Sequence, residues 1–187
     1  MSASKRDELI QKALKIFYRD GFHATGMDKL VKETGISKTS MYNHFRTKED
    51  LILAALRLRD ELFRNRMYRR VEELSDDPRG QLEALFTSLD EWFHSEEFKG
   101  CMFIKASGEY PLHGTPIHNI SAEHKNLVQS YIEEIATKAG ARDPETLAKH
   151  LMLLKEGAII TAHMHGPAGV ADDALSAARI LIKEQIN

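Results

Sequence analysis

Residues 25–51 read TGMDKLVKETGISKTSMYNHFRTKEDL, and this stretch decides the fold of the first part of the chain. A segment of about eight residues, 27–34, precedes Gly35; three residues then form a turn, and about eight more follow. Gly35 suits the positive φ that a three-residue turn needs. Met41 and Phe45, four residues apart, give the second segment one apolar face. The spacing predicts a helix-turn-helix, whose second helix enters the major groove of DNA.

The other face of that second helix carries the residues that could touch a partner. It presents four polar side chains to solvent: Lys38, Thr39, Tyr42 and Asn43. These residue types can reach phosphates and base edges. The sequence therefore predicts a nucleic-acid contact on this face.

Helical spacing of apolar residues continues along the whole chain. We expect helices over residues 5–20, 27–34, 38–45, 48–74, 79–95, 100–110, 117–139, 143–165 and 171–185. No alternating apolar pattern bounded by turn pairs indicates a strand. The fold is predicted to be all-α with about nine helices, and residues 75–78 are the clearest linker.

Charge is unevenly distributed along the chain, although the net charge is only -2. Residues 1–70 carry 16 Lys and Arg against 9 Asp and Glu, a net charge of +7. Residues 71–187 carry 10 against 19, a net charge of -9. A basic first part suggests a polyanionic partner, and chance clustering of solvated charges is the alternative.

Cysteine content and hydropathy bear on the compartment. The one cysteine, Cys101, excludes a disulfide within the chain and fits a reducing environment. The first residues lack the apolar stretch of a signal peptide, and no apolar run approaches the ~20 residues that span a bilayer. We expect a cytoplasmic protein without a membrane partner.

A family resemblance is carried by four features of residues 25–51. They are Thr25 before the first motif helix, the turn Gly35-Ile36-Ser37, the run Tyr42-Asn43-His44-Phe45, and Lys48 three residues later. In these features the chain resembles the TetR/AcrR transcriptional regulators, over about residues 5–55. The resemblance implies a three-helix DNA-binding domain at residues 1–50. It also implies a helical ligand-binding and dimerisation domain at residues 51–187.

The resemblance also assigns roles to single residues. It implies these DNA-binding residues: Thr25, Ser37, Lys38, Thr39, Ser40, Tyr42, Asn43, His44 and Lys48. Thr25, Tyr42 and Lys48 would contact phosphates, and His44 would do so or support the backbone beside it. Asn43 is a candidate reader of adenine. Taken singly, Tyr42, His44 and Lys48 could instead be ordinary half-buried or solvated residues.

The resemblance further implies a homodimer on a palindromic double-stranded operator, and a repressor released by an unidentified small molecule. Apolar residues recur on one face of each of the last two helices, which suggests pairing between subunits. They are Leu151, Leu154, Ala158 and Thr161 or Ala162, then Leu175, Ala178, Ile182 and Ile186. The alternative is that these faces close each subunit's own core.

Aromatic, methionine and acidic residues of the middle helices are candidates for a ligand pocket. They are Phe63, Phe86, Trp92, Phe93, Met102, Phe103, Tyr110, Met152 and Glu156, and plain core packing is the alternative for them. The later histidines form no i, i+4 pair, so we expect no metal site and no cofactor.

Two rival functions remain to be weighed. An enzyme would need a phosphate loop, a nucleophile elbow or a metal motif, and none is found, so no catalytic residue is predicted. The second rival is a ligand-binding or interaction module with a vestigial DNA face. The presence of Thr25, Tyr42 and Lys48 argues against it.

Overall fold

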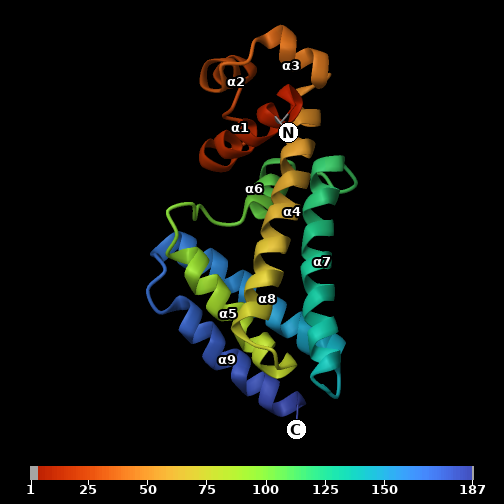
Figure 1. The fold of residues 1–187 in the computed structure, drawn as a ribbon, viewed down its shortest axis with the longest axis vertical. Helices are drawn as coiled ribbons and strands as arrows, with labels where there is room; N and C mark the ends of the chain where they lie inside the picture. Colours follow the sequence, from red (N-terminus) through yellow and green to blue (C-terminus); the bar gives the residue numbers. More distant parts are fainter. Residues whose placement is uncertain (1–3, 187) are drawn as a thin grey trace. The chain divides into compact units, whose positions relative to one another are not determined.

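The computed structural model describes residues 4–186, which form nine α-helices and no strand within that range (Figure 1). The helices are α1 Lys5–Asp20, α2 Met27–Thr34, α3 Lys38–His44, α4 Lys48–Leu74, α5 Pro78–Phe93, α6 Met102–Glu109, α7 Pro116–Lys138, α8 Pro144–His165 and α9 Val170–Gln185. The all-α prediction is confirmed. The predicted bounds of α1, α2 and α4 are those observed, and the ends of the other helices agree to within two residues.

Several helices begin at a side-chain cap that local sequence specifies. The Ser37 hydroxyl oxygen accepts a hydrogen bond from the backbone N–H of Ser40, 3.2 Å away. Asp77 accepts from the N–H of Gly80 at 2.8 Å, with Pro78 in the first turn. Such caps satisfy backbone donors that the first helical turn leaves open.

The helices pack as two compact units, and the division falls inside α4 and α7. Unit 1 comprises Met1–Phe63 and Met102–His124, and unit 2 comprises Arg64–Cys101 and Lys125–Asn187. Unit 1 therefore contains α6 in addition to the first three helices. The expected functional boundary near residue 50 is a different kind of division and stays a prediction.

The core of unit 1 joins α1 to the helix-turn-helix. Leu9, Phe17, Phe22 and Leu30 have no exposed surface, and the Phe17 and Phe22 rings stack with centroids 5.5 Å apart. Burying such side chains stabilises a fold by about 1.5–3 kcal/mol each. The α1 helix thus forms the base on which α2 and α3 are held.

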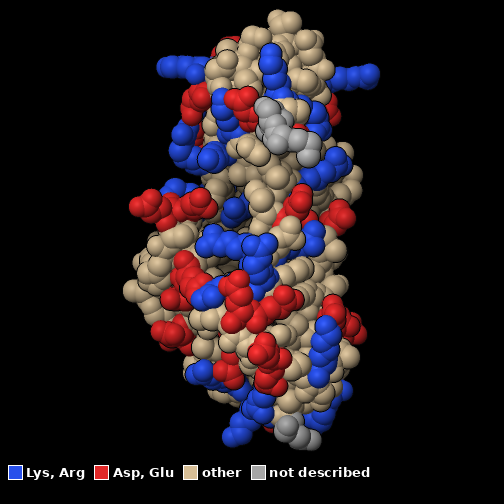
Figure 2. Space-filling model, viewed as in Figure 1, with Lys and Arg blue, Asp and Glu red and all other residues tan. Residues whose placement is uncertain are grey.

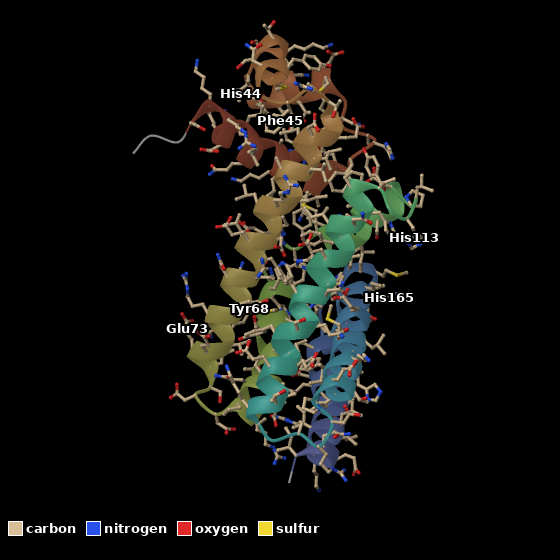
Figure 3. The ribbon with its side chains drawn as sticks, turned by 90° about the vertical axis from the view of Figure 1, so that its right-hand side faces the viewer. His44, Phe45, Tyr68, Glu73, His113 and His165 are labelled. Atoms are coloured by element: carbon tan, nitrogen blue, oxygen red, sulfur yellow. The ribbon has the colours of Figure 1, made fainter. Side chains whose placement is uncertain are left out.

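Unit 2 is built from α5, α8 and α9, which pack against one another, together with parts of α4 and α7. The Tyr68 ring on α4 (Figure 3) stacks on Tyr131 of α7 with centroids 3.7 Å apart. No helix in residues 4–186 combines the length and apolarity that crossing a membrane requires.

The faces of α8 and α9 that were expected to form the contact between subunits lie largely inside the core of the single chain. Most of these residues are buried within unit 2: Leu151, Ala158, Ala162, Ala178, Ile182 and Ile186. For these six residues the assignment was wrong, because they close the subunit's own core; Leu154 and Leu175 are half-buried and Thr161 is exposed, and pairing of the two helices between subunits stays a prediction. The large exposed apolar side chains are others: Leu153 (71%), Ile160 (44%) and Met164 (68%) on α8, and Ile180 (71%) on α9.

Candidate nucleic-acid interface

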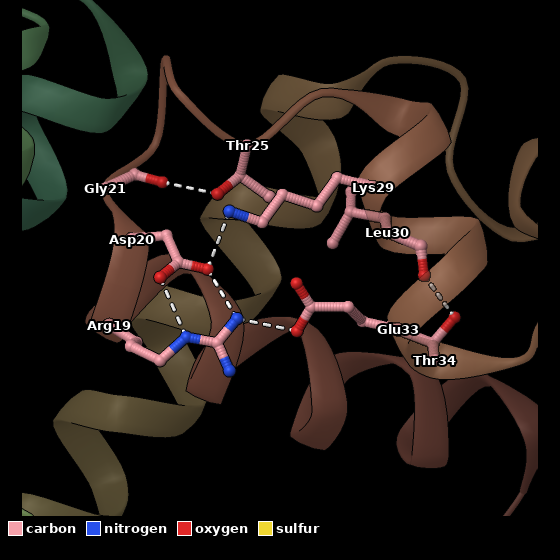
Figure 4. Close-up of polar contacts among 8 residues, drawn as sticks. All are labelled: Arg19, Asp20, Gly21, Thr25, Lys29, Leu30, Glu33 and Thr34. Atoms are coloured by element: carbon pink, nitrogen blue, oxygen red, sulfur yellow. Dashed lines mark hydrogen bonds and ion pairs between the residues drawn. The ribbon is translucent and has the colours of Figure 1, made fainter.

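The turn between α2 and α3 is held by a short chain of hydrogen bonds. Gly35 has φ 71° and ψ 9°, and its N–H donates to the carbonyl of Val31 at 3.0 Å. The Thr34 hydroxyl donates to the carbonyl of Leu30 at 2.7 Å (Figure 4) and accepts from the N–H of Ile36 at 3.1 Å. These bonds fix the backbone of the turn between the end of α2 and Ser37, the residue that caps α3.

The α3 helix presents one apolar face inward and one polar face outward. Met41 is 1% exposed and Phe45 is 8% exposed, as their spacing predicts. Figure 3 labels His44 and Phe45 together at the end of α3. Most of the predicted contact residues are exposed, with Tyr42 at 46%: Ser37, Lys38, Thr39, Tyr42, Asn43 and His44; Ser40 is half-buried.

The α3 helix and the residues just after it contribute no acidic side chain to the outward face. Residues 38–47 include Lys38 and Arg46 and no acidic residue. Lys38 lies 3.3 Å from Asp28 of α2, and both side chains are more than half exposed. An exposed pair of this kind is worth about 0–1 kcal/mol, so a phosphate can compete for Lys38. In the view of Figure 2, basic side chains project from the part of unit 1 that carries α2 and α3.

Thr25 lies differently from what its predicted role requires. It has no exposed surface, and its hydroxyl donates to the carbonyl of Gly21 at 2.7 Å (Figure 4). In this conformation the hydroxyl is therefore not available to a phosphate. Thr25 instead stabilises the turn that leads into α2, through its hydrogen bond to Gly21.

Lys48 is half-buried at the start of α4. Its Nζ atom donates to the carbonyl of Phe22 at 3.0 Å. An ammonium group has three N–H donors, so this bond leaves capacity for a second acceptor. The residue thus links α4 to the turn before α2.

Four charged side chains tie the end of α1 to α2 (Figure 4). Arg19 donates to Asp20 at 2.7 and 2.5 Å and to Glu33 at 2.6 Å, and Lys29 lies 2.8 Å from Asp20. Arg19, with help from Lys29, holds the pKa of Asp20 well below its usual range. Arg19 is 54% exposed, so solvent screening keeps the contribution to stability small. The network orients α2 more than it stabilises the fold.

The nine candidates for a ligand pocket are divided between the two units. Unit 1 holds Phe63, Met102, Phe103 and Tyr110, and unit 2 holds Trp92, Met152 and Glu156. The other two candidates, Phe86 and Phe93, are buried in unit 2. Each unit therefore has its own group of these residues, some buried and some half-buried.

In unit 1 the sequence reasoning missed the polar centre of this group. His124 is 2% exposed; its Nδ1 atom lies 2.7 Å from Asp60, and its ring stacks on Phe103 with centroids 3.7 Å apart. The Phe63 ring meets His124 edge-on at 5.6 Å. The signal was available, because buried positions 117, 121, 124 and 128 fall on one face of α7.

In unit 2, Glu156 is the centre of a largely buried charged cluster. Its carboxylate accepts from Lys125 at 2.5 Å and from the fully buried Lys155 at 2.9 Å. Lys125 also lies 3.2 Å from the sulfur of Cys101. Burial opposes the charge on Glu156, but the two ammonium groups outweigh burial and lower its pKa to about 2. Burial also lowers the pKa of Lys155.

Histidines and acidic residues do not assemble into a metal centre in residues 4–186. No group of three or more His, Cys, Asp or Glu side chains in that range has an arrangement that could hold a metal ion. His113 and His118 lie together with ring centroids 4.3 Å apart. His118 also lies 3.2 Å from the carbonyl of Tyr110.

Comparisons with known proteins agree with this geometry. A family model described as "Bacterial regulatory proteins, tetR family" matches residues 9–55. The HTH-type transcriptional regulator YjdC of Escherichia coli is 25% identical over 157 residues, which cover 83% of this chain and 81% of YjdC. The regulator LmrA of Bacillus subtilis is 25% identical over 162 residues, covering 83% of this chain and 84% of LmrA.

A solved structure extends the similarity over nearly the whole chain. The crystal structure of a TetR-family transcriptional regulator from Streptomyces coelicolor superposes with a TM-score of 0.90 at 28% identity. It covers 97% of this chain and 96% of its own. The likeness therefore reaches well beyond the matched residues of the helix-turn-helix.

Proposed function

Because this chain belongs to the TetR family of DNA-binding, helix-turn-helix transcriptional regulators, which are not enzymes, we propose that it is a dimeric repressor released by a small molecule. Its target is a palindromic operator in double-stranded DNA. The observation that carries this function is the exposed polar face of α3, held on a buried apolar face and free of acidic residues.

The roles on that face divide into positioning and reading. Tyr42, His44 and Lys48 position the motif on phosphates, which fix register without carrying sequence information. The N-terminal turn of α3, residues 37–40, lies closest to the base edges. Asn43 reads a base, because its amide can pair with the N6 and N7 atoms of adenine.

A dimer is proposed because one motif covers only half of a palindromic site. Two recognition helices must lie about 34–36 Å apart to enter successive turns of the major groove. The exposed apolar side chains of α8 and α9, defined by Leu153, Ile160, Met164 and Ile180, are the surface for this contact. Apolar exposure of this kind is typical of a protein interface.

Release by a small molecule is proposed for residues 51–187, the part that follows the DNA-binding domain. A ligand shifts the equilibrium only if it binds the DNA-incompetent conformation more tightly. The buried groups around His124 and around Glu156 supply a few polar atoms among apolar side chains, which is the chemistry of a ligand site. Both groups are candidates for holding the effector.

The test is a titration of the full-length chain against the DNA upstream of its own gene, followed by fluorescence anisotropy at several salt concentrations. We expect tight binding to a palindromic segment and weaker binding when one half-site is scrambled. Asn43→Ala should cost about 1–3 kcal/mol and relax the preference at one base pair. Asn65→Ala, an exposed asparagine on α4, is the matched control. Equal affinity for operator and scrambled DNA would contradict the proposal.

A further inference from the structure

The turn between α1 and α2 is fastened to a residue that lies 87 positions further along the chain. Both carboxylate oxygens of Glu109, the last residue of α6, accept from the backbone N–H of Phe22, at 2.9 and 3.1 Å. One of them also accepts from the N–H of His23, at 2.5 Å. The side chain of His23 makes a further contact with the same residue: its Nε2 atom lies 2.7 Å from the backbone carbonyl oxygen of Glu109.

A second side chain of α6 holds the end of α1 beside this turn. Lys105, one helical turn before Glu109, donates to the carbonyl of Tyr18 at 3.3 Å. Its Nζ atom also lies 5.3 Å from the centre of the Tyr18 ring. Residues four apart on a helix project from the same face. One face of α6 therefore forms hydrogen bonds both to the last turn of α1 and to the turn that follows it.

The approach of Glu109 to the turn is close. A Cβ atom at position 21 would lie 3.0 Å from Oε1 of Glu109, and Gly21 has φ +85°. The backbone angle therefore favours glycine, and a Cβ atom would also push the Glu109 carboxylate away by a few tenths of an ångström. The carboxylate of Glu109 is therefore packed directly against the backbone of this turn.

The next residue, Tyr110, supports the turn through ring contacts only. Its ring stacks on His23 with centroids 4.6 Å apart and meets Phe22 edge-on at 6.4 Å. Its buried hydroxyl has no hydrogen-bond partner in residues 4–186. The polar link between α6 and this turn therefore depends on Glu109 and on its contacts with Phe22 and His23.

We propose that Glu109 is a positioning residue for DNA binding, which acts by fixing the turn that leads into α2. The proposal rests on the DNA-binding function of the helix-turn-helix. Hydrogen bonds to an ionised acceptor are roughly twice as strong as neutral ones. When the turn is held, α2 and α3 keep the orientation that enters the groove. When it is released, only a fraction of molecules is competent, and the apparent Kd rises by the inverse of that fraction.

The matched pair of variants is Glu109→Gln and Glu123→Gln. Both remove one negative charge from unit 1, but Glu123 is exposed on α7 and, within the described residues, makes no hydrogen bond to the turn. The amide nitrogen of Gln cannot accept a hydrogen bond, so Glu109→Gln loses the two-oxygen contact while keeping the side chain's length. A difference between the two variants therefore reports the contact and not the charge.

Two measurements on the full-length chain test the inference. Amide hydrogen exchange followed by NMR should show faster exchange at Phe22 and His23 in Glu109→Gln, with the amides of α8 unchanged. Operator affinity should fall by roughly tenfold in Glu109→Gln and by less than about twofold in Glu123→Gln. The salt dependence should keep its slope, because no phosphate contact is lost.

Either of two results would overturn the inference. One is unchanged exchange at Phe22 and His23 in Glu109→Gln, which tests the contact without any DNA. The other is an operator affinity of Glu109→Gln that lies within twofold of the value for the unsubstituted protein. If the unsubstituted protein itself bound no operator, the proposed function would fail while the exchange measurement still decided the contact. Lys105→Met, which spares the carboxylate, is the second variant if Glu109→Gln does not fold.

Discussion

The Nζ atom of Lys48 lies 3.0 Å from the carbonyl oxygen of Phe22. The first residue of α4 is thereby bonded to the turn that precedes α2. This contact gives Lys48 two separable roles, since it holds the turn and it carries a positive charge beside the proposed DNA face. The two roles predict different salt dependences for the same substitution.

Lys48→Met should weaken binding to operator and to unrelated DNA by a similar factor. If Lys48 contacts a phosphate, the slope of log K against log salt should fall by about one unit. Anisotropy titrations at four or five salt concentrations measure both quantities. A loss of affinity with an unchanged slope would show that Lys48 acts only through the carbonyl of Phe22.

Gly35→Ala should lower the free energy of unfolding by about 1 kcal/mol, because residue 35 has φ 71° and alanine disfavours that region. A Cβ there would meet no atom within 4 Å, so the effect is one of backbone conformation. Gly108→Ala is the control: the site is equally open but helical, and alanine should be neutral or stabilising there. Urea denaturation of both variants measures the difference, and a shift of the same sign in both would contradict the argument.

Glu156→Gln should destabilise the protein by at least about 2 kcal/mol at pH 7, because it removes the carboxylate that two ammonium groups share. The folded-state pKa of about 2 lies below the ordinary value for Glu. The stabilisation is therefore complete above about pH 4.5 and is lost as the pH falls from there towards 2.

Stability measured between pH 7 and pH 2 should consequently fall less steeply in Glu156→Gln than in the unsubstituted protein. Glu134→Gln is a suitable control, since Glu134 forms an exposed i, i+4 pair with Lys138 at 2.7 Å. Exposed pairs contribute little, so its profile should follow that of the unsubstituted protein. Parallel profiles for all three proteins would refute a stabilising role of the cluster.

Leu153→Glu should shift the proposed dimer towards monomer, because it places a charge in the exposed apolar surface of α8 and α9. Leu112→Glu is the matched control, since Leu112 is exposed to the same extent, 71%, but lies in the loop before α7. Sedimentation velocity of both variants at equal concentration checks this. A dimer that persists in Leu153→Glu would place the subunit contact elsewhere.

Helix positions and the motif were predictable because the signals that set them are local. Caps such as Ser37 and Asp77 act over three residues, and the spacing of Met41 and Phe45 acts over one helical turn. The family resemblance rested on residues within one short stretch. Each of these features can be seen without knowing what the helix packs against.

The error over the dimer face shows where local reasoning ends. The α8 helix carries apolar residues on two faces, one with Leu151 and Ala158 and the other with Leu153 and Ile160. Periodicity alone cannot say which face is internal. That choice is made by α5 and α9, which cover the first face and leave the second exposed.

By itself, the sequence determined an all-helical chain, a helix-turn-helix at about residues 27–45 and its outward polar face, because hydrogen bonds and side-chain spacing within a few residues decide these. Only the tertiary structure decided that the Thr25 hydroxyl is turned inward, that His124 pairs with Asp60, and that Glu109 holds Phe22 and His23. The latter two contacts join residues more than sixty positions apart. No pattern within one helix encodes them, since they form only when the packed cores bring distant segments together.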